Sequence, residues 1–324
     1  MSTVVFSAAG ERRIPALRLL FARFPVEEHE TRLRDAIASS ERGALQLDHL
    51  LLAEADGLPV GSALVMLQSD GIALVWPPVV SCGAADPTEV EDLLMREICQ
   101  RVDAASAKLG QCLLSPGDEA EAAILSRHGF ECATDMFFLA RAITDADRSP
   151  APAQNGQPVP AGAGGDGITI ETYCAENADR FSQVVEATYR GSLDCPYLNG
   201  LRTGVEAIAS HKLSGQFDPT RWALYAVDGR DAGVILLNDH PDQDAIELVY
   251  LGVAPEARGR GLGRRMLRDG LRESAQRGRA VMFLAVDCEN HFANSLYGEF
   301  DFAELARRRV MLRRQAGLST AFAQ

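Results

Sequence analysis

The sequence predicts an α/β protein built from two successive halves of similar layout. Short apolar runs rich in β-branched residues alternate with longer segments in which apolar residues recur every three or four positions, as in strands and helices. The order of these elements is the same in residues 1–143 and 167–324, which indicates a tandem duplication. Residues 144–166 are rich in Pro, Ala and Gly without periodicity, which predicts a flexible linker between two domains.

The elements of the two halves follow from these patterns and from turn residues such as Asp56-Gly57 and Asp228-Gly229. In the first half we expect strands at residues 3–7, 49–53, 60–68, 72–80, 111–114 and 136–143, and helices at 14–24, 27–39, 88–109 and 118–128. In the second half we expect strands at 168–173, 222–227, 233–238, 246–253 and 280–286 and further strands after 300, with helices at 177–188, 205–212, from 262 onward and at 290–297.

The most informative stretch joins the strand at 246–253 to the helix that begins at 262. It contains three glycines two positions apart, interleaved with arginines: Gly259, Gly261 and Gly263 with Arg258, Arg260, Arg264 and Arg265. Glycines let backbone N–H groups approach an anion closely, and a helix N-terminus adds partial positive charge. The stretch therefore predicts a phosphate or pyrophosphate site, and the alternative is a glycine-rich turn without a ligand.

The spacing of these glycines excludes two common phosphate loops. A Walker loop needs Gly-Lys-Ser/Thr, and no lysine is nearby; a dinucleotide fingerprint needs a glycine where Arg264 or Met266 stands. What remains, Arg258-x-x-Gly261-x-Gly263 after a strand, resembles the acetyl-CoA signature of the Gcn5-related N-acetyltransferase (GNAT) family. The family's second motif, N-x-x-A-x-x-L-Y-x-x-x-G-F, is matched by Asn290, Ala293, Leu296, Tyr297 and Phe302, with Asp301 replacing the usual glycine.

The resemblance covers the second half in its motifs and the first half only in layout. It implies two tandem domains of the family's fold, each a mixed, mostly antiparallel twisted sheet flanked by helices. It also implies acetyl-CoA as the cofactor. The cofactor-binding residues that it implies are Leu251, Gly252 and Val253 on the strand, Arg258, Gly259, Arg260, Gly261, Leu262, Gly263 and Arg264 in the loop and helix start, and Asn290, Asn294 and Tyr297 on the later helix.

Two catalytic residues follow from the same resemblance. Glu247 lies six residues before Val253, where several family members carry a glutamate that acts as general base; the alternative is a glutamate on a solvated face or in an ion pair. Tyr297 matches a tyrosine near the cofactor sulfur, a candidate general acid, and the alternative is a core aromatic. His291 is a weaker candidate base, because its position is off the helix face shared by Asn290, Asn294 and Tyr297. The irregular residues 192–200 lie where the family builds its acceptor wall, and Asp194 is suited to attract a cationic amine.

Composition limits the other classes of function. The chain has 324 residues and a net charge of −13, which argues against a nucleic-acid binder. Residues 258–314 nevertheless hold thirteen arginines against seven acidic residues, which suggests a polyanionic ligand or a solvated helix face. The seven cysteines form no Cys-x-x-Cys pair, so we expect reduced, buried thiols, no metal site and a cytoplasmic location. No apolar run is long enough to span a membrane.

These observations favour an acetyl-CoA-dependent N-acetyltransferase that acts in its second half by direct attack of a primary amine, in a small molecule or a peptide. The first half has four acidic residues where its phosphate loop would lie: Asp86, Glu89, Glu91 and Asp92. We interpret it as a degenerate copy without a cofactor site. The alternative is a non-catalytic acyl-CoA-binding module whose acidic first half binds a partner.

Overall fold

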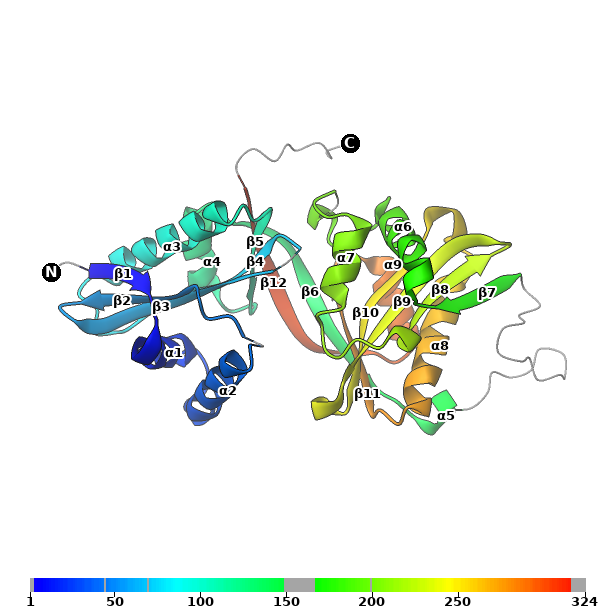
Figure 1. The fold of residues 1–324 in the computed structure, drawn as a ribbon, viewed down its shortest axis with the longest axis horizontal. Coiled ribbons are helices and arrows are strands. Elements are labelled where there is room, and N and C mark those ends of the chain that lie inside the picture. The colour runs from blue at the N-terminus through cyan, green and yellow to red at the C-terminus, as the bar shows by residue number, and fades with distance from the viewer. Residues whose placement is uncertain (1–2, 44, 69, 149–166, 199, 316–324) are drawn as a thin grey trace. The chain divides into compact units, whose positions relative to one another are not determined.

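The structure, a computed structural model, describes residues 3–315 except 44, 69, 149–166 and 199 (Figure 1). Its described residues divide into two compact units, which are treated separately below. One unit holds the residues up to Ala133 together with those from Arg309 onward, and the other spans Thr134–Arg308. Most of the predicted linker, 149–166, lies outside the described residues. Its first part is a short helix, α5 (Asp145–Arg148), in which the carboxylate of Asp147 accepts hydrogen bonds from Thr144 and Arg141.

The first unit is built on a six-stranded sheet in the order β1-β2-β3-β4-β5-β12. Its elements are β1 (Thr3–Ser7), α1 (Arg13–Phe21), α2 (His29–Glu41), β2 (Leu50–Ala55), β3 (Leu58–Leu67), β4 (Ile72–Val80), α3 (Pro87–Ala104), β5 (Leu109–Leu114), α4 (Glu119–Arg127) and the end of β12 (Ala303–Arg314). Only β4 and β5 pair in parallel, through residues 72–74 and 109–111. Residues 309–314 of β12 close the sheet antiparallel to β5.

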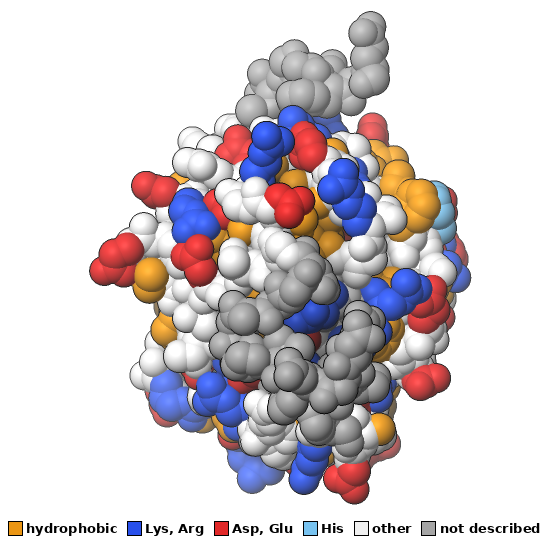
Figure 2. Space-filling model, turned by 90° about the vertical axis from the view of Figure 1, so that its right-hand side faces the viewer, with side chains coloured by type: hydrophobic (Ala, Val, Ile, Leu, Met, Phe, Trp, Pro, Cys, Tyr) orange, Lys and Arg blue, Asp and Glu red, His pale blue; other side chains and the backbone are white. Residues whose placement is uncertain are grey.

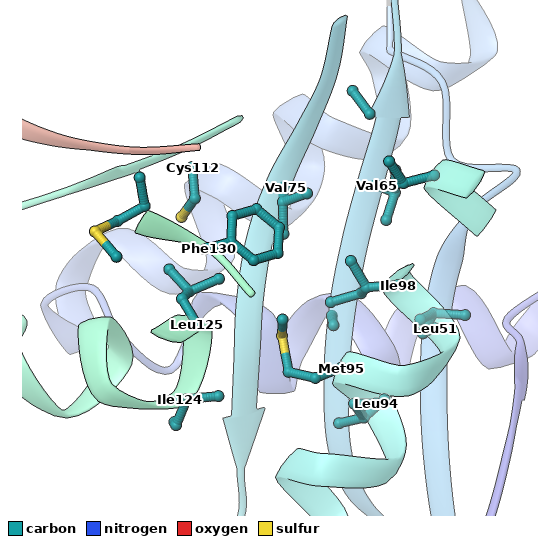
Figure 3. Close-up of a cluster of buried hydrophobic side chains, with 14 of the residues drawn as sticks. Leu51, Val65, Val75, Leu94, Met95, Ile98, Cys112, Ile124, Leu125 and Phe130 are labelled. Atoms are coloured by element: carbon teal, nitrogen blue, oxygen red, sulfur yellow. The ribbon is translucent and has the colours of Figure 1, made fainter. Parts of the chain in front are cut away.

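Alternate residues of this sheet pack into separate cores on its two faces. Leu51 faces a core made with α3 and α4, whereas Leu50 and Leu52 face one made with α1 and α2. Figure 3 shows the first of these cores, with Leu94 and Ile98 of α3 among its side chains. A strand buried on both faces reads as a continuous apolar run, which is why residues 50–53 are all leucine or alanine.

The second unit repeats this layout with the order β7-β8-β9-β10-β11-β6. Its elements are β6 (Glu131–Ala142), β7 (Ile168–Thr172), α6 (Ala178–Tyr189), α7 (Gly204–His211), β8 (Trp222–Val227), β9 (Arg230–His240), β10 (Ala245–Val253), α8 (Leu262–Gln276), β11 (Val281–Asp287) and α9 (His291–Glu299). Helices α6 and α7 cover one face and α8 and α9 the other. The predicted mixed, mostly antiparallel sheets flanked by helices are confirmed.

The unit boundaries differ from the contiguous ranges 1–143 and 167–324 that the sequence predicts. Residues 136–142 of β6 pair antiparallel with β11, so this strand belongs to the second sheet although it precedes the linker. The end of β12 in turn belongs to the first sheet. Hydrophobic periodicity identifies a strand but carries no information about the sheet that it joins, and the exchange was therefore missed.

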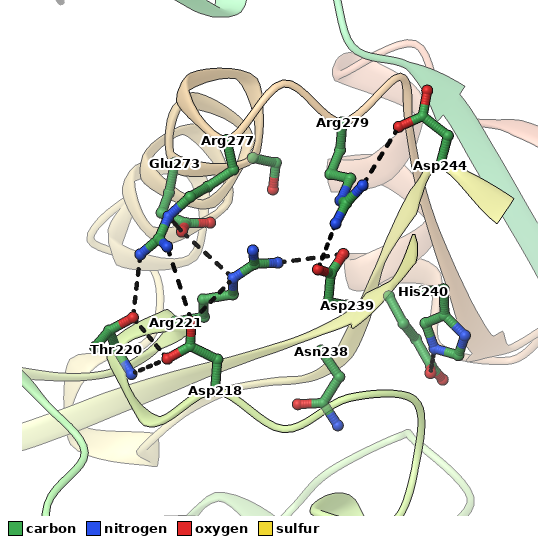
Figure 4. Close-up of polar contacts among 12 residues, drawn as sticks. Asp218, Thr220, Arg221, Asn238, Asp239, His240, Asp244, Glu273, Arg277 and Arg279 are labelled. Carbon is green, nitrogen blue, oxygen red and sulfur yellow. Dashed lines mark hydrogen bonds and ion pairs between the residues drawn. The ribbon is translucent and has the colours of Figure 1, made fainter. Parts of the chain in front are cut away.

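A network of charged side chains joins the end of α8 to β9 in the second unit (Figure 4). Arg221 is 8% exposed and lies within ion-pair distance of Asp218, Asp239 and Glu273. Burial raises the pKa of Glu273. Burial also opposes ionisation of Asp239, but the hydrogen bond from Arg279 and the charge of Arg221 lower its pKa overall. A buried guanidinium needs such partners, so these arginines serve the fold rather than a ligand.

Candidate active site

Strands β10 and β11 separate in the middle of the second unit. Their parallel pairing covers residues 245–247 of β10 and 281–283 of β11, and the ladder ends at Glu247. Beyond it β10 remains paired with β9 on its other side, after a bulge between Leu248 and Tyr250. Residues 251–253 of β10 therefore border an opening toward β11. In a strand, an edge released from its neighbour leaves backbone groups available to pair with an extended ligand.

The loop after β10 leads into α8 with the backbone exposed. Gly259 and Gly261 have φ of +74° and +78°, and no atom lies within 4 Å of a Cβ built on either. Gly261 is the N-cap of α8, and no side chain caps this helix. The first N–H groups of a helix have no partner within it, so those of Leu262, Gly263 and Arg264 face a space that an anion fits.

Two further glycines near this space, Gly252 and Gly263, are explained by different neighbours. A Cβ on Gly252 would come within 3 Å of the side chains of Tyr250 and Thr188, so this glycine admits α6 and not a ligand. A Cβ on Gly263 would be 3.6 Å from Leu296, which is ordinary contact and would admit alanine.

The side chain of Arg258 does not point to the free N–H groups at the start of α8. Its guanidinium donates to the backbone carbonyls of Val253, Gly191 and Thr188 at 3.0, 3.1 and 2.8 Å. The side chain thus ties the end of α6 to the end of β10. Leu262 is 5% exposed and packs in the core, so that only its backbone faces the loop.

The remaining arginines of residues 258–314 are mostly paired with acidic side chains. The pairs include Arg264–Glu299, Arg265–Asp269, Arg272–Asp269, Arg277–Glu273, Arg279–Asp239, Arg307–Asp135, Arg309–Glu119 and Arg313–Asp103. Side chains of both signs are interspersed over the face that Figure 2 shows, outside its grey residues. Most of the positive charge of this segment is therefore neutralised by acidic side chains of the protein itself. Arg260 is exposed and makes no ion pair with any residue that the structure describes.

Glu247 lies at the point where β10 leaves β11. Its Oε2 accepts a hydrogen bond from Ser214 Oγ at 2.5 Å and lies 2.8 Å from His240 Nε2, which carries the proton because the carboxylate can only accept. The Glu247 side chain is 21% exposed. Its environment is thus polar and partly exposed, and among the described residues both of these contacts are made by Oε2. Sequence reasoning missed both donors, because His240 is placed by the register of β9 against β10 and Ser214 by a loop after α7 whose carbonyl accepts a hydrogen bond from Asn238 of β9.

Tyr297 is 6% exposed and packs against Phe302 with ring centroids 5.6 Å apart. Burial, with a smaller contribution from the charge of Asp194, raises the pKa of Tyr297. The hydroxyl therefore keeps its proton at neutral pH. Its role as core aromatic and its role as proton donor are compatible in this geometry.

The two predicted asparagines of α9 have structural partners. Asn290 is the N-cap, with Oδ1 accepting the N–H of Ala293, and Asn294 Nδ2 donates to the carbonyls of Asp287 and Cys288. Asn294 Oδ1 is buried without a partner in the described part of the chain. Asp301 has a φ of +60°, the left-handed conformation that the usual glycine would adopt, so the turn is kept.

His291 is exposed, and its ring lies beside that of Phe292. The seven cysteines are free but only Cys112 is buried, so the expectation of buried thiols is wrong for most of them. Among the described residues there is no group of His, Cys, Asp and Glu suited to a metal ion. No helix in the described ranges is long and apolar enough to cross a membrane.

Comparison with known proteins agrees with this geometry. The model described as "Acetyltransferase (GNAT) family" matches residues 188–302, from the end of α6 to the residue after α9 and its turn. A mycothiol acetyltransferase of Stackebrandtia nassauensis is 30% identical over 274 residues, which cover 82% of this chain and 81% of that protein.

Solved structures show the same fold at lower identity. A GCN5-related N-acetyltransferase from Sphaerobacter thermophilus has a TM-score of 0.62 at 20% identity and covers 96% of this chain and 95% of its own. A tandem GNAT protein from the clavulanic acid biosynthesis pathway has a TM-score of 0.54 at 14% identity, covering 97% and 98%. The protein is thus an acetyltransferase. It belongs to the GNAT family.

Proposed function

We propose that the protein transfers the acetyl group of acetyl-CoA to a primary amine of a small molecule, at the opening between β10 and β11. The observation that carries this proposal is the uncapped start of α8 beside a released strand edge, with Glu247 at the point of separation. No equivalent exists at α3, where the carboxylate of Asp86 caps the helix by accepting the N–H of Glu89 at 3.0 Å.

The residues present fit acetyl-CoA. The bare glycine backbone and first turn of α8 would hold the pyrophosphate, and residues 251–253 would pair with the pantetheine arm; bound in this way, the cofactor supplies an activated acetyl group. Arg260 is free to add positive charge, while Arg258 keeps the loop in place. Asn290 and Asn294 would act mainly by fixing the start of α9.

Glu247 would accept the proton of the incoming ammonium, directly or through one water molecule. Ser214 and His240 hold one carboxylate oxygen and leave the other for this purpose. Tyr297, which keeps its proton, would donate to the departing thiolate. For Glu247 and Tyr297 to act on the same reaction, the amine would have to enter between them.

The acceptor is proposed as a small-molecule amine because the relative that matches most of this chain is named a mycothiol acetyltransferase. The test is to incubate the full chain with acetyl-CoA and a panel of small-molecule amines, and to follow free thiol. Amine-dependent thiol release with a matching acetylated product supports the proposal. Binding of acetyl-CoA without turnover on any amine would instead indicate a non-catalytic binding module.

A further inference from the structure

The last residues of α6 and the turn that follows cross the opening between β10 and β11. We call residues 188–195 the strap. On the β10 side, Arg258 donates to the carbonyls of Thr188 and Gly191. On the β11 side, the N–H of Cys195 donates to Asp287 Oδ2 at 3.0 Å, and the N–H of Asp287 donates to Asp194 Oδ1 at 3.1 Å. The strap is therefore fastened at both borders of the opening.

Asp287, the last residue of β11, connects the strap with two other segments. Its side chain is buried, with the residue 1% exposed. Its Oδ1 accepts from Thr134 Oγ1 at 2.6 Å and from the N–H of Glu289 at 2.9 Å. Thr134 lies on β6, which precedes the linker in sequence but belongs to this unit. One carboxylate thus joins β6, the approach to α9 and the strap.

The strap places its own polar groups at the reacting centre. Asp194 Oδ1 accepts the N–H of Asp287 at the end of β11, so this carboxylate lies at the β11 border of the opening. Tyr189 of the strap packs edge-on against Tyr250, with centroids 6.3 Å apart, and its hydroxyl is buried without a well-formed hydrogen bond. An acceptor that enters between β10 and β11 therefore meets the strap.

We propose that Asp287 is a positioning residue that fixes the strap across the opening and thereby fixes the acceptor amine, with Thr134 as its support. The inference rests on the proposed function, because an acceptor amine is bound only if the protein is an N-acetyltransferase. The hold of Asp287 on the strap does not depend on that function. Asp287 itself is directed at backbone and hydroxyl groups and has no part in proton transfer.

The chemistry of a carboxylate suggests a selective variant, Asp287→Asn. An asparagine has one accepting oxygen, and two donors, Thr134 and Glu289, converge on Oδ1. The amide oxygen will therefore stay on that side, and the NH₂ group will face the N–H of Cys195, donor against donor. This variant should free the strap at Cys195, while the bond from the backbone N–H of residue 287 to Asp194 remains and β6 and α9 stay attached.

Two measurements test the variant on the full chain. Hydrogen exchange at the amide of Cys195 should become at least about 10-fold faster, because a charge-assisted hydrogen bond is lost. The KM for the amine should rise about 10-fold or more, while the dissociation constant for coenzyme A stays within a factor of about 2. Thr134→Val should change the exchange rate and the amine KM in the same direction but less. Thr134→Ser, which keeps the hydroxyl, should behave as the wild type does.

Asp231→Asn is the matched control, because Asp231 binds Arg180 and neither the strap nor Asp287. It should lower stability without changing the Cys195 exchange rate or the amine KM. Unchanged exchange at Cys195 in Asp287→Asn would overturn the inference, as would faster exchange with an unchanged amine KM in an active enzyme. If the wild-type protein acetylates no amine, the proposed function fails, and the exchange data still decide whether Asp287 holds the strap.

Discussion

The side chains around the opening divide into those that face a substrate and those that hold the backbone. Glu247 and Tyr297 were predicted from family positions; Glu247 lies where the pairing of β10 with β11 ends, and Tyr297 is buried on α9 against Phe302. Arg258 also matches its motif, yet its guanidinium binds three carbonyl oxygens. A motif records which residue type is needed at a position but not which atoms it meets. For the same reason Asp287, which matches no motif, was missed.

Replacing the proposed base should affect turnover alone. Glu247→Gln keeps the shape of the side chain and an oxygen for Ser214, but it cannot accept the amine proton. We expect kcat to fall by about 10²–10⁴ with unchanged coenzyme A affinity, measured by thiol release and calorimetry. Ser214→Ala, which keeps the carboxylate and removes one donor, should lower kcat far less. Full activity of Glu247→Gln on a good amine would exclude Glu247 as the base.

Replacing the proposed acid should lower turnover without changing its pH dependence. Because burial raises the pKa of Tyr297, its hydroxyl remains protonated above the ordinary tyrosine pKa of about 10. Removing it therefore deletes no group that titrates between about pH 6 and 10, and the alkaline limb of the Tyr297→Phe profile should match that of the wild type.

Tyr225→Phe is the control for this experiment. Tyr225 is also buried with a raised pKa, but its hydroxyl meets Asp269 on α8. Its kcat should equal that of the wild type. A pH–rate profile of Tyr297→Phe that loses an alkaline limb would show that the hydroxyl titrates in this range.

Helices and strands were predicted well where the pattern is local. The loop from β10 to α8 was anticipated because its three glycines and the start of the amphipathic pattern are adjacent in sequence. Helix α3 ends at Ala104 instead of 109, since the turn before β5 begins earlier than the apolar pattern ends. The separation of β10 from β11 has no signal in either strand, because it depends on how two distant segments pair.

The conformation of Gly261 gives a test of the loop. Its φ of +78° is strained for any residue with a Cβ, although no atom would collide. Gly261→Val should abolish coenzyme A binding and lower the unfolding free energy by about 1–2 kcal/mol. Gly261→Asn tolerates the left-handed conformation better, and should be more stable yet still bind poorly, because its side chain fills the space proposed for the pyrophosphate.

Gly278 offers a control at the other end of α8. It has a φ of +77° and equally open surroundings. Gly278→Val should lose similar stability and bind coenzyme A as the wild type does. Comparable loss of binding in both valine variants would mean that the effect is one of folding, and the loop would not be the cofactor site.

The molecule as a whole contains one fold twice, with different chemistry at corresponding places. In the first unit β4 and β5 also part after three residues, but β4 carries Pro77 and Pro78, which have no N–H to offer a ligand. Helix α3 is capped by its own Asp86. The sequence indicated this difference through its acidic residues, whereas the exchanged strands could be found only from the pairing.

One coenzyme A should therefore bind per chain, because the carboxylate of Asp86 that caps α3 repels a phosphate. Titration calorimetry should give a stoichiometry of about one, and Gly261→Asn should remove most of the signal, because its side chain fills the space proposed for the pyrophosphate. A second site that persists in Gly261→Asn would place a cofactor in the first unit. The matched variant Asp86→Ser keeps a cap but removes the charge, and should not create binding.

The exchange of strands also sets the order in which the units can be completed during synthesis. Leu109 of β5 pairs with Arg314, about 200 positions later in the chain. At the usual elongation rate of about 5–20 residues per second, β5 waits roughly 10–40 s on the ribosome for its neighbour. In the second unit β11 pairs with β6, and β6 has already been synthesised when β11 emerges. The unit whose translation begins first is the one whose sheet closes last.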